Sequence, residues 1–375
     1  MPLMDRLWRM RDTLMADARF QRFSADFPLS RPIARRESKA AFDLCAGFVY
    51  SQILMACVRL NLFELLAGEP KSLEAIAART ALPIPAAERL LDAAVSLRLA
   101  DKRSGGRYGL GAIGAAMRGN AAITNMIAHH DMLYRDLADP VALLRGTAAA
   151  TEVSRFWAYA RPDDHGALQH TDVSGYTQLM ATSLDLIAGD ILDAAPIPAT
   201  GALLDIGGGD GTFLSHVARR HAGLTLSLLD LPAVAQIATD RFSSDGLSTR
   251  CTAIGGDMFT HALAPNFDVV TLVRVALDHD DVKVLTLLQQ AASALRPGGQ
   301  LLIAEPQAGV PGAEAMGAAY FGFYLLAMGQ GRARSFNEIG DLLRQAGFVS
   351  IRAIATRRPL LVGLVAAAKK SDTGM

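Results

Sequence analysis

The spacing of hydrophobic and polar residues changes character along the chain. Between residues 38 and 120, apolar side chains recur at helical intervals, as at Ile53, Leu54 and Cys57, which predicts amphipathic helices. From about residue 176 onward, short continuous apolar runs alternate with amphipathic segments. Such an alternation predicts an α/β domain whose largely parallel sheet is covered by helices on both faces.

The first half contains two expected helices followed by a short hairpin. Ser72 suits the start of one helix, Pro83 interrupts the pattern, and a second helix is expected from about Ala86. The pair at 105–106 is Gly-Gly, which marks the turn of the hairpin. Two helices and a hairpin form a winged-helix pattern, used for DNA binding or for dimerisation. The second helix carries mostly Leu and Ala rather than Lys or Arg, which favours dimerisation.

The second half predicts alternating helices and strands. The residues Leu184, Ile187 and Ile191 mark an amphipathic helix before the first strand. Strands are expected at 203–206, 224–230, about 249–254, 267–275 and 300–305, with helices at 212–221, 233–242 and 281–295. In such sheets, ligands bind at the carboxyl ends of the strands.

The pattern is less regular between the two halves, over residues 121–175. His129 and His130 stand beside Met132 and Tyr134, which makes them candidates for a pocket lining as well as for ordinary surface or core positions. Residues 161–174 are polar and contain Pro and Gly, which predicts a loop or lid.

Composition narrows the class of protein. The chain has 375 residues, 51% of them hydrophobic, with 37 basic and 37 acidic side chains, so the formal charge is zero. This length and apolar content predict two or three globular domains and argue against a surface that binds polyanions throughout. The three cysteines are scattered without a metal-binding spacing, which favours the cytoplasm and predicts no metal.

The N-terminal residues 1–37 form an amphipathic extension of mixed charge without the pattern of a signal peptide. The most apolar stretch, residues 42–58, is interrupted by polar side chains and slightly short for a membrane span. We interpret it as a buried or interface helix, with a membrane-surface role as the alternative.

A glycine-rich turn carries the first chemical signal. Asp205 is followed by Gly207, Gly209 and Gly211, placed between a strand and a helix. Glycine there allows a tight turn and a close approach of the backbone to a ligand. A dinucleotide fingerprint would need its third glycine where Thr212 stands, and no GK[ST] follows, so a P-loop is excluded.

Two further acidic residues follow neighbouring strands. Asp230 ends the second strand, where a carboxylate can accept hydrogen bonds from ribose hydroxyls. Asp257 follows the third strand and could accept a hydrogen bond from an adenine amine, with Met258 or Phe259 packing on the ring.

These motifs together resemble the S-adenosylmethionine-dependent O-methyltransferases of the plant caffeate and acetylserotonin type, over about residues 40–355. The motifs that carry the resemblance are LLDIGGGDG, SLLDLP, GGDMF, RVALDHDD, ALRPGGQLLIAEP and RSFNEIGDLLRQAGF. The resemblance implies a helical, winged-helix-like dimerisation domain (38–120), a linker and acceptor-pocket region (121–175) and a Rossmann-like class I methyltransferase domain (176–375). It also implies a homodimer, with residues 42–66 as the candidate interface. Arg274, Met180 and Ser183 are then expected to bind the cofactor S-adenosylmethionine, and Tyr176 to lie where the linker helix reaches the site.

The chain resembles the bacterial demethylspheroidene (hydroxyneurosporene) methyltransferases still more. The similar stretches lie outside the cofactor motifs: FQRFSADFPLSRPIARR, FDLCAGFVYSQILMACVRLNLF, HHDMLYRDLADPVALLRG and TEVSRFWAYA. This resemblance implies methylation of the tertiary 1-hydroxyl of an acyclic carotenoid. Because such an acceptor dissolves in lipid, we expect a cytoplasmic enzyme with peripheral contact at the inner or photosynthetic membrane, made through the amphipathic N-terminus.

One position departs from the family pattern. Plant-type members have a His as general base before an Asp, but Leu277 stands here before Asp278. A tertiary alcohol loses its proton late, so positioning can drive much of the transfer. His279 is the best-placed imidazole by sequence, and Asp278 could orient it or accept the proton; His129 and His130 compete with it. The alternative is that His279 fills the family's aromatic position while Asp280 or Asp281 caps the next helix.

Two further parts of the sequence match the family pattern less specifically. Glu305 ends the fifth strand, where the family places an acidic residue near the missing His. Residues 315–331, which include Phe321 and Tyr324, predict a helix over an apolar acceptor pocket or an ordinary core helix.

Other functions remain open from the residues alone. The acceptor could be a phenol, an indole or a tetrapyrrole carbon. A ligand-sensing winged-helix regulator would bind DNA, whereas the zero net charge and the second helix predict no nucleic-acid partner. A nicotinamide-dependent oxidoreductase conflicts with Thr212 and the GGDMF segment.

Overall fold

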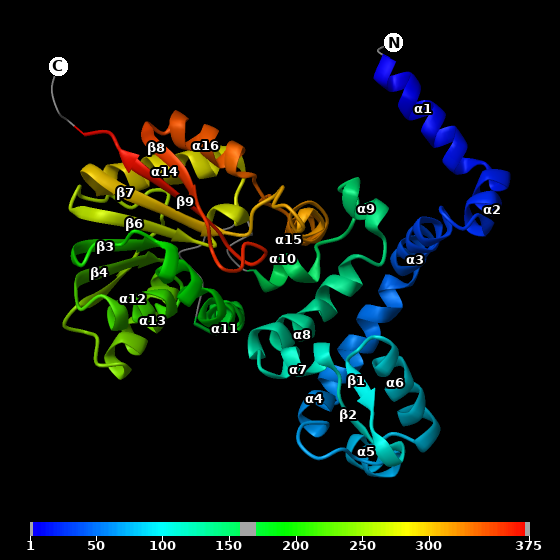
Figure 1. Cartoon of the computed structure of the whole chain (residues 1–375). Helices are drawn as coiled ribbons and strands as arrows, with labels where there is room; N and C mark the ends of the chain where they lie inside the picture. Colours follow the sequence, from blue (N-terminus) through cyan, green and yellow to red (C-terminus); the bar gives the residue numbers. More distant parts are fainter. Residues whose placement is uncertain (1–2, 158–169, 372–375) are drawn as a thin grey trace. The chain divides into compact units, whose positions relative to one another are not determined.

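A computed structural model describes residues 3–157 and 170–371, and the chain divides into two compact units, Met1–Gly119 and Asn120–Met375 (Figure 1). The boundary falls one residue before the region that the sequence predicts as a linker and acceptor pocket. In the structure, residues 120–157 belong to the same unit as the sheet.

The first unit is helical apart from one hairpin. Its elements are α1 (Leu3–Ala16), α2 (Ala18–Asp26), α3 (Arg31–Arg59), α4 (Leu62–Leu65), α5 (Leu73–Thr80), α6 (Ile84–Ser96), β1 (Ala100–Lys102), β2 (Tyr108–Leu110) and α7 (Ala112–Arg118). Ser72 caps α5 by accepting a hydrogen bond from the N–H of Ala75, as its sequence position predicts. Helix α6 begins at Ile84, earlier than expected, because Pro85 is tolerated in a first turn.

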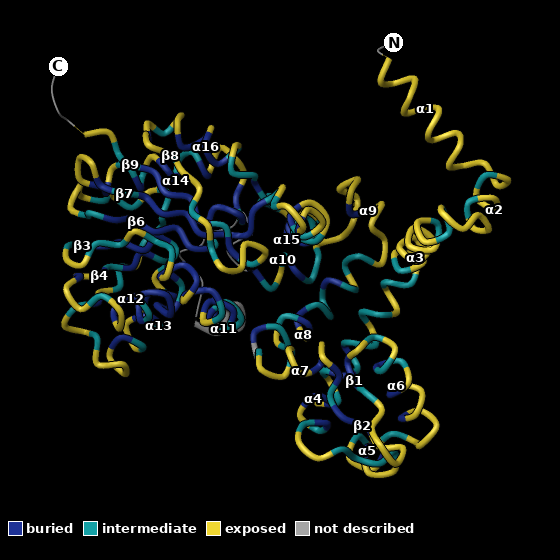
Figure 2. The backbone as a smooth tube through the Cα atoms, in the orientation of Figure 1, coloured by how far each residue is buried: buried dark blue, intermediate teal, exposed yellow. Residues whose placement is uncertain are grey.

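Burial differs sharply within this unit. Cys57, Leu62, Phe63 and Leu91 are buried in its core, whereas no residue of α1 or α2 is buried (Figure 2). Within the described residues, α3 has the length and composition of a membrane span, a test that core helices of soluble proteins also pass.

The second unit is built on a seven-stranded sheet with the order β5-β4-β3-β6-β7-β9-β8. Its strands are β3 (Thr200–Ile206), β4 (Gly223–Asp230), β5 (Cys251–Gly255), β6 (Phe267–Val273), β7 (Leu295–Glu305), β8 (Phe348–Ile354) and β9 (Gly363–Lys369). The first five pair in parallel, and β9 pairs antiparallel with β7 and β8. The predicted parallel sheet is confirmed, and the antiparallel pair β8–β9 is an addition to it.

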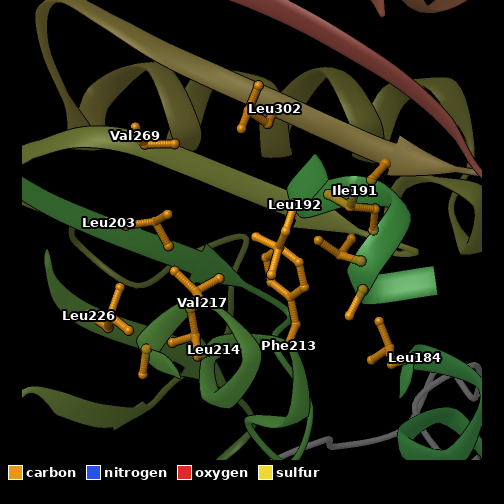
Figure 3. Close-up of a cluster of buried hydrophobic side chains, with 14 of the residues drawn as sticks. Leu184, Ile191, Leu192, Leu203, Phe213, Leu214, Val217, Leu226, Val269 and Leu302 are labelled. Atoms are coloured by element: carbon orange, nitrogen blue, oxygen red, sulfur yellow. The ribbon is translucent and has the colours of Figure 1, made fainter. Parts of the chain in front are cut away.

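Helices cover both faces of the sheet, which explains the continuous apolar strands. Figure 3 shows side chains of α11 (His170–Ala194) and α12 (Thr212–Arg220) meeting Leu203 and Val269 on one face. Helix α13 (Pro232–Ser244) joins the same cluster. On the other face, α14 (Asp281–Ala294) and α16 (Phe336–Gln345) pack on Leu204 and Val270. Successive strand residues therefore enter opposite cores.

The segment after Gly119 is more regular than the sequence predicts. It forms α8 (Ala121–Asp136), α9 (Pro140–Leu144) and α10 (Glu152–Phe156), which begin at the capping side chains of Asn120, Asp139 and Thr151. Helices α9 and α10 have only five residues each, and helices that short are specified more by their caps and packing than by periodicity. Of the predicted loop 161–174, residues 161–169 lie outside the described part, and residues 170–174 are instead the first turn of α11.

A π-helical segment, Met316–Phe321, precedes α15 (Gly322–Met328). The expected helix at 315–331 is thus present, with an irregular first half. Such π segments occur frequently at functional sites.

Candidate functional site

The glycine-rich turn leads from β3 into α12 and opens a pocket at the carboxyl ends of β3, β4, β5 and β6. Gly207 and Gly209 have positive φ angles of 71° and 61° and both line this pocket. A Cβ atom on Gly207 would lie 2.7 Å from the Val275 side chain, so the turn tolerates no larger residue there. Gly211 caps α12 and stands behind the pocket wall.

Two carboxylates, the partly buried Asp230 and the buried Asp205, form a polar side of the pocket. Asp230 accepts hydrogen bonds from the N–H groups of Gly209 at 2.8 Å and Leu231 at 2.7 Å, and burial raises its pKa to about 6. Asp205 accepts one from the Thr271 hydroxyl at 2.6 Å, and burial raises its pKa to about 7. The second carboxylate oxygen of Asp205 has no partner among the described residues. A buried oxygen of this kind favours a bound hydrogen-bond donor.

The far wall of the pocket is formed by the segment after β5. Asp257, Met258 and Phe259 line it, and Asp257 accepts a hydrogen bond from the Phe259 N–H at 2.9 Å. His279 is buried and meets the Phe259 ring edge-on, with ring centroids 5.1 Å apart. His279 thus lines this pocket and contacts an aromatic ring.

A second, largely apolar pocket adjoins the first. Its lining comes mainly from α8, α11, the π segment and α15, and includes Ile123, Met126, His130, Ser183, Ile187, Leu277, Met316, Tyr320, Phe321, Tyr324 and Leu361. Trp157, Met180, Arg274 and Asp278 line both pockets. These four side chains mark the junction of the two pockets.

Arg274 stands at that junction in an unusual conformation. Its φ is +59°, and its guanidinium donates a hydrogen bond to the Ser183 hydroxyl at 2.6 Å. A non-glycine residue held at positive φ costs of order 1 kcal/mol, and such residues cluster at functional sites. Ser183, expected at the cofactor, lines the second pocket and reaches the first one through Arg274.

Two hydrogen-bonded His–Tyr pairs support the second pocket. His129 and the Tyr324 hydroxyl are 2.7 Å apart, and Trp157 donates to the same hydroxyl at 2.8 Å. His130 and the Tyr320 hydroxyl are 2.8 Å apart. Burial lowers the pKa of His129 to about 4, so its imidazole is neutral at physiological pH. His130 lines the pocket, whereas His129 is buried behind Tyr324.

A short helical turn, Ala276–Asp278, carries Asp278 into the junction. Two buried charged side chains hold the turn. Glu305 accepts a hydrogen bond from the Leu277 N–H at 2.9 Å, and Arg334 donates to the carbonyl oxygens of Ala276 at 2.8 Å and His279 at 2.6 Å. Burial raises the pKa of Glu305 to about 7. Glu305 lines neither pocket, so the structure assigns it to the support of this turn.

The structure also accounts for the capping residues of the neighbouring helices. Asp280 caps α14 by accepting from the Lys283 N–H, and Glu338 forms a capping box with Ser335 at the start of α16. The Ser335 N–H and the Arg332 guanidinium hold the pKa of Glu338 at about 2.

Most of the predicted site residues therefore gather at two adjoining pockets, except Gly211, Glu305 and His129, which stand behind their walls. The side chain of Tyr176 lies outside the described residues. Sequence reasoning missed Trp157, Tyr320 and Arg334. The aromatic run at 156–159 and the Tyr-rich segment 315–331 were signals for the first two, whereas no local pattern marks Arg334.

Comparison with known proteins identifies the family. Residues 134–349 match the O-methyltransferase domain, and residues 42–118 match the O-methyltransferase dimerisation domain. The chain belongs to the O-methyltransferase family. The dimerisation match supports a homodimer and agrees with the interpretation of the winged-helix pattern as a dimerisation domain.

Individual relatives agree with this assignment. The demethylspheroidene O-methyltransferase of Cereibacter sphaeroides is 38% identical over 369 residues, 98% of this chain and 96% of the relative. That of Rhodobacter capsulatus is 38% identical over 343 residues, 91% of this chain and 84% of the relative. The crystal structure of the S-adenosylmethionine-dependent methyltransferase SibL has a TM-score of 0.72 and 25% identity, covering 88% of this chain and 99% of its own. The predicted family and class I methyltransferase fold are confirmed.

Proposed function

We propose that this enzyme transfers the methyl group of S-adenosylmethionine to the tertiary 1-hydroxyl of an acyclic carotenoid of the demethylspheroidene type. The main support for a carotenoid acceptor is the 38% identity to a demethylspheroidene O-methyltransferase over 98% of the chain. The apolar second pocket, which adjoins the first at Asp278, is consistent with a long hydrocarbon that ends in one hydroxyl.

The residues of the first pocket fit S-adenosylmethionine. Asp230 would accept from the ribose hydroxyls, and Asp257 with Met258 and Phe259 would hold the adenine. The unpartnered oxygen of Asp205 would accept from the amino group, and Arg274 would face the carboxylate. When bound, this cofactor would supply a methyl group on a positively charged sulfur. An oxygen lone pair can attack that methyl carbon and displace the sulfur as a neutral thioether.

The ribose role of Asp230 predicts a specific binding defect. Asp230→Asn removes the charge from the ribose-facing acceptor while keeping nearly the same shape. Hydrogen bonds to charged groups contribute about 1.5–3 kcal/mol, so we expect cofactor affinity to fall about 10- to 100-fold. Calorimetric titration with S-adenosylhomocysteine measures this loss. Asp240→Asn, at an exposed position on the following helix, is the matched control and should bind normally. Equal affinities in both variants would contradict the assignment.

The chain's own contribution to the reaction is to orient the acceptor and to receive its proton. The new bond forms between the hydroxyl oxygen and the methyl carbon while the carbon–sulfur bond breaks. As the oxygen gains positive character its proton becomes strongly acidic, so a carboxylate suffices as acceptor. We assign this role to Asp278, the only carboxylate in the described residues that lines both pockets. His279, packed on Phe259, then contributes to the cofactor pocket instead.

The decisive test of the proposed function is methyl transfer from labelled S-adenosylmethionine to demethylspheroidene or hydroxyneurosporene in detergent. A catechol and a reaction without acceptor run beside it. We expect label in the carotenoid alone. Label in the catechol alone would show that the acceptor is a phenol and not a carotenoid. Label in neither, with cofactor binding retained, would overturn the proposal.

A carotenoid acceptor determines where the enzyme must work. A carotenoid acceptor partitions into the hydrocarbon of a bilayer, so a cytoplasmic homodimer must meet it at a membrane surface. We therefore infer peripheral contact with the membrane that holds the acceptor.

A further inference from the structure

Helices α1 and α2 leave an unusually apolar surface uncovered. Leu3, Leu7, Trp8, Met10 and Leu14 of α1 are between 46% and 74% exposed. The Phe23 and Phe27 rings stack with centroids 5.4 Å apart, and these side chains are 59% and 42% exposed. Contiguous exposed apolar patches of this kind mark interaction sites.

Most of these side chains share one face of α1. At 100° per residue, Leu3, Leu7, Met10 and Leu14 fall within one arc of about 60°, whereas Trp8 lies outside it. Arg9 and Ala16 lie on the opposite side. We define the apolar face as Leu3, Leu7, Met10 and Leu14 of α1 together with Phe23 and Phe27 of α2.

The dimerisation domain does not account for this face. The family match begins at residue 42 and so includes the exposed Phe42, Leu44 and Phe48 of α3, which are available to a second copy of the chain. The apolar face lies wholly before residue 42. It therefore needs an occupant of its own.

The charge and length of the segment favour a lipid surface. Residues 1–37 contain eight arginines and five acidic residues, so their formal charge is 8 − 5 = +3, in a chain whose total is zero. Arginine binds phosphate in a bidentate manner, and Phe and Leu side chains suit the boundary of headgroups and acyl chains. Helix α1 has 14 residues, fewer than the roughly 20 that span a bilayer, so it would lie in the membrane plane.

We propose that the apolar face of α1 and α2 docks the enzyme on a membrane that contains anionic lipids, with Leu3, Leu7 and Leu14 below the headgroups. This inference rests on the proposed function for the reason to visit a membrane. The surface itself is independent of the acceptor's identity.

The test uses the full-length protein with sedimented vesicles of phosphatidylcholine alone, or of phosphatidylcholine with about one-third phosphatidylglycerol. We expect stronger binding to the anionic vesicles, weakened by salt. The double variant Leu7→Asp/Leu14→Asp should reduce this binding at least about tenfold, because two apolar side chains no longer enter the bilayer. The control Arg9→Gln/Ala16→Asp makes the same change in net charge on the opposite side of α1 and should retain more of the binding.

Three results would contradict the proposal that this face docks on a membrane. These are no binding of the native protein to either vesicle, equal losses in both double variants, or loss of the dimer in Leu7→Asp/Leu14→Asp by light scattering. The last result would assign the face to a second copy.

Activity measurements distinguish this proposal from the proposed function. The Leu7→Asp/Leu14→Asp variant should methylate detergent-solubilised acceptor normally and vesicle-borne acceptor slowly. Vesicle binding without any carotenoid methylation would contradict the proposed carotenoid acceptor but would still support the membrane-docking face.

Discussion

Replacing Asp278 by Asn is expected to lower the rate of methyl transfer by about 100-fold while leaving cofactor affinity nearly unchanged. Asp278 lines both pockets, and it follows Leu277, the position where the family resemblance leads one to expect a basic His. General-base catalysis contributes typically 10²–10⁴-fold, and the lower end applies here because the proton leaves late. Asparagine keeps the size of the side chain but cannot take up the proton. Single-turnover kinetics with saturating carotenoid would measure the effect on the chemical step.

The matched control for Asp278 is its neighbour. His279→Gln changes a side chain that packs on Phe259 in the first pocket and does not line the second. We expect this variant to weaken cofactor binding, raising KM for the cofactor more than it lowers kcat. If His279→Gln instead abolished the chemical step while Asp278→Asn retained it, the imidazole would be the proton acceptor. The assignment to Asp278 would then be wrong.

Replacing Arg334 by Met is expected to destabilise the second unit by about 3–5 kcal/mol. Arg334 is 1% exposed, and its guanidinium donates to the carbonyls of Ala276 and His279 and pairs with Asp281. Removing one partner of such a buried charged network leaves polar groups without hydrogen bonds. For a unit of this size the loss corresponds to a fall in Tm of about 10 °C. Thermal unfolding followed by circular dichroism measures it.

The same variant should reduce activity beyond its effect on stability, because the turn that carries Asp278 loses one of its two supports. Arg334→Lys should recover part of the rate, since one ammonium replaces some of the lost hydrogen bonds. The control is Arg332→Met: Arg332 pairs with Asp281 and Glu338 but its side chain is 42% exposed. Exposed pairs contribute about 0–1 kcal/mol, so Tm should change little. Equal Tm shifts for the two arginines would contradict the proposed role of Arg334.

The parts of the fold that sequence reasoning predicted are those with local signals. Strand β3 and its glycine turn follow one another within a dozen residues, and a strand buried on both faces is visible as a continuous apolar run. Strands β8 and β9 were missed. The first is largely exposed, with Phe348 as its buried residue, and the second is rich in Ala, a residue with low strand preference. Strand β9 pairs with β7, a contact distant in the sequence, and β8 joins the sheet only through β9.

The residues of the candidate site also differ in whether a local sequence pattern predicts them. Asp230 and Asp257 could be predicted because the end of a parallel strand is a position in the chain as well as in space. The different surroundings of Asp278 and His279 could not. These residues are adjacent in sequence, yet one lines both pockets and the other packs on Phe259. The direction of each side chain depends on Glu305 and Arg334, which reach the turn from elsewhere in the chain.

The amino-acid sequence alone was sufficient for the methyltransferase domain, its cofactor motifs, the missing basic His and the amphipathic N-terminus, because each is a pattern of neighbouring residues. Folding was required to join the two pockets at Asp278 and to pair His130 with Tyr320. It also buried His129 and Glu305 behind the pocket walls and placed Arg334 under the turn. Each of these outcomes depends on contacts between residues far apart in the chain, which residue type and spacing leave undetermined.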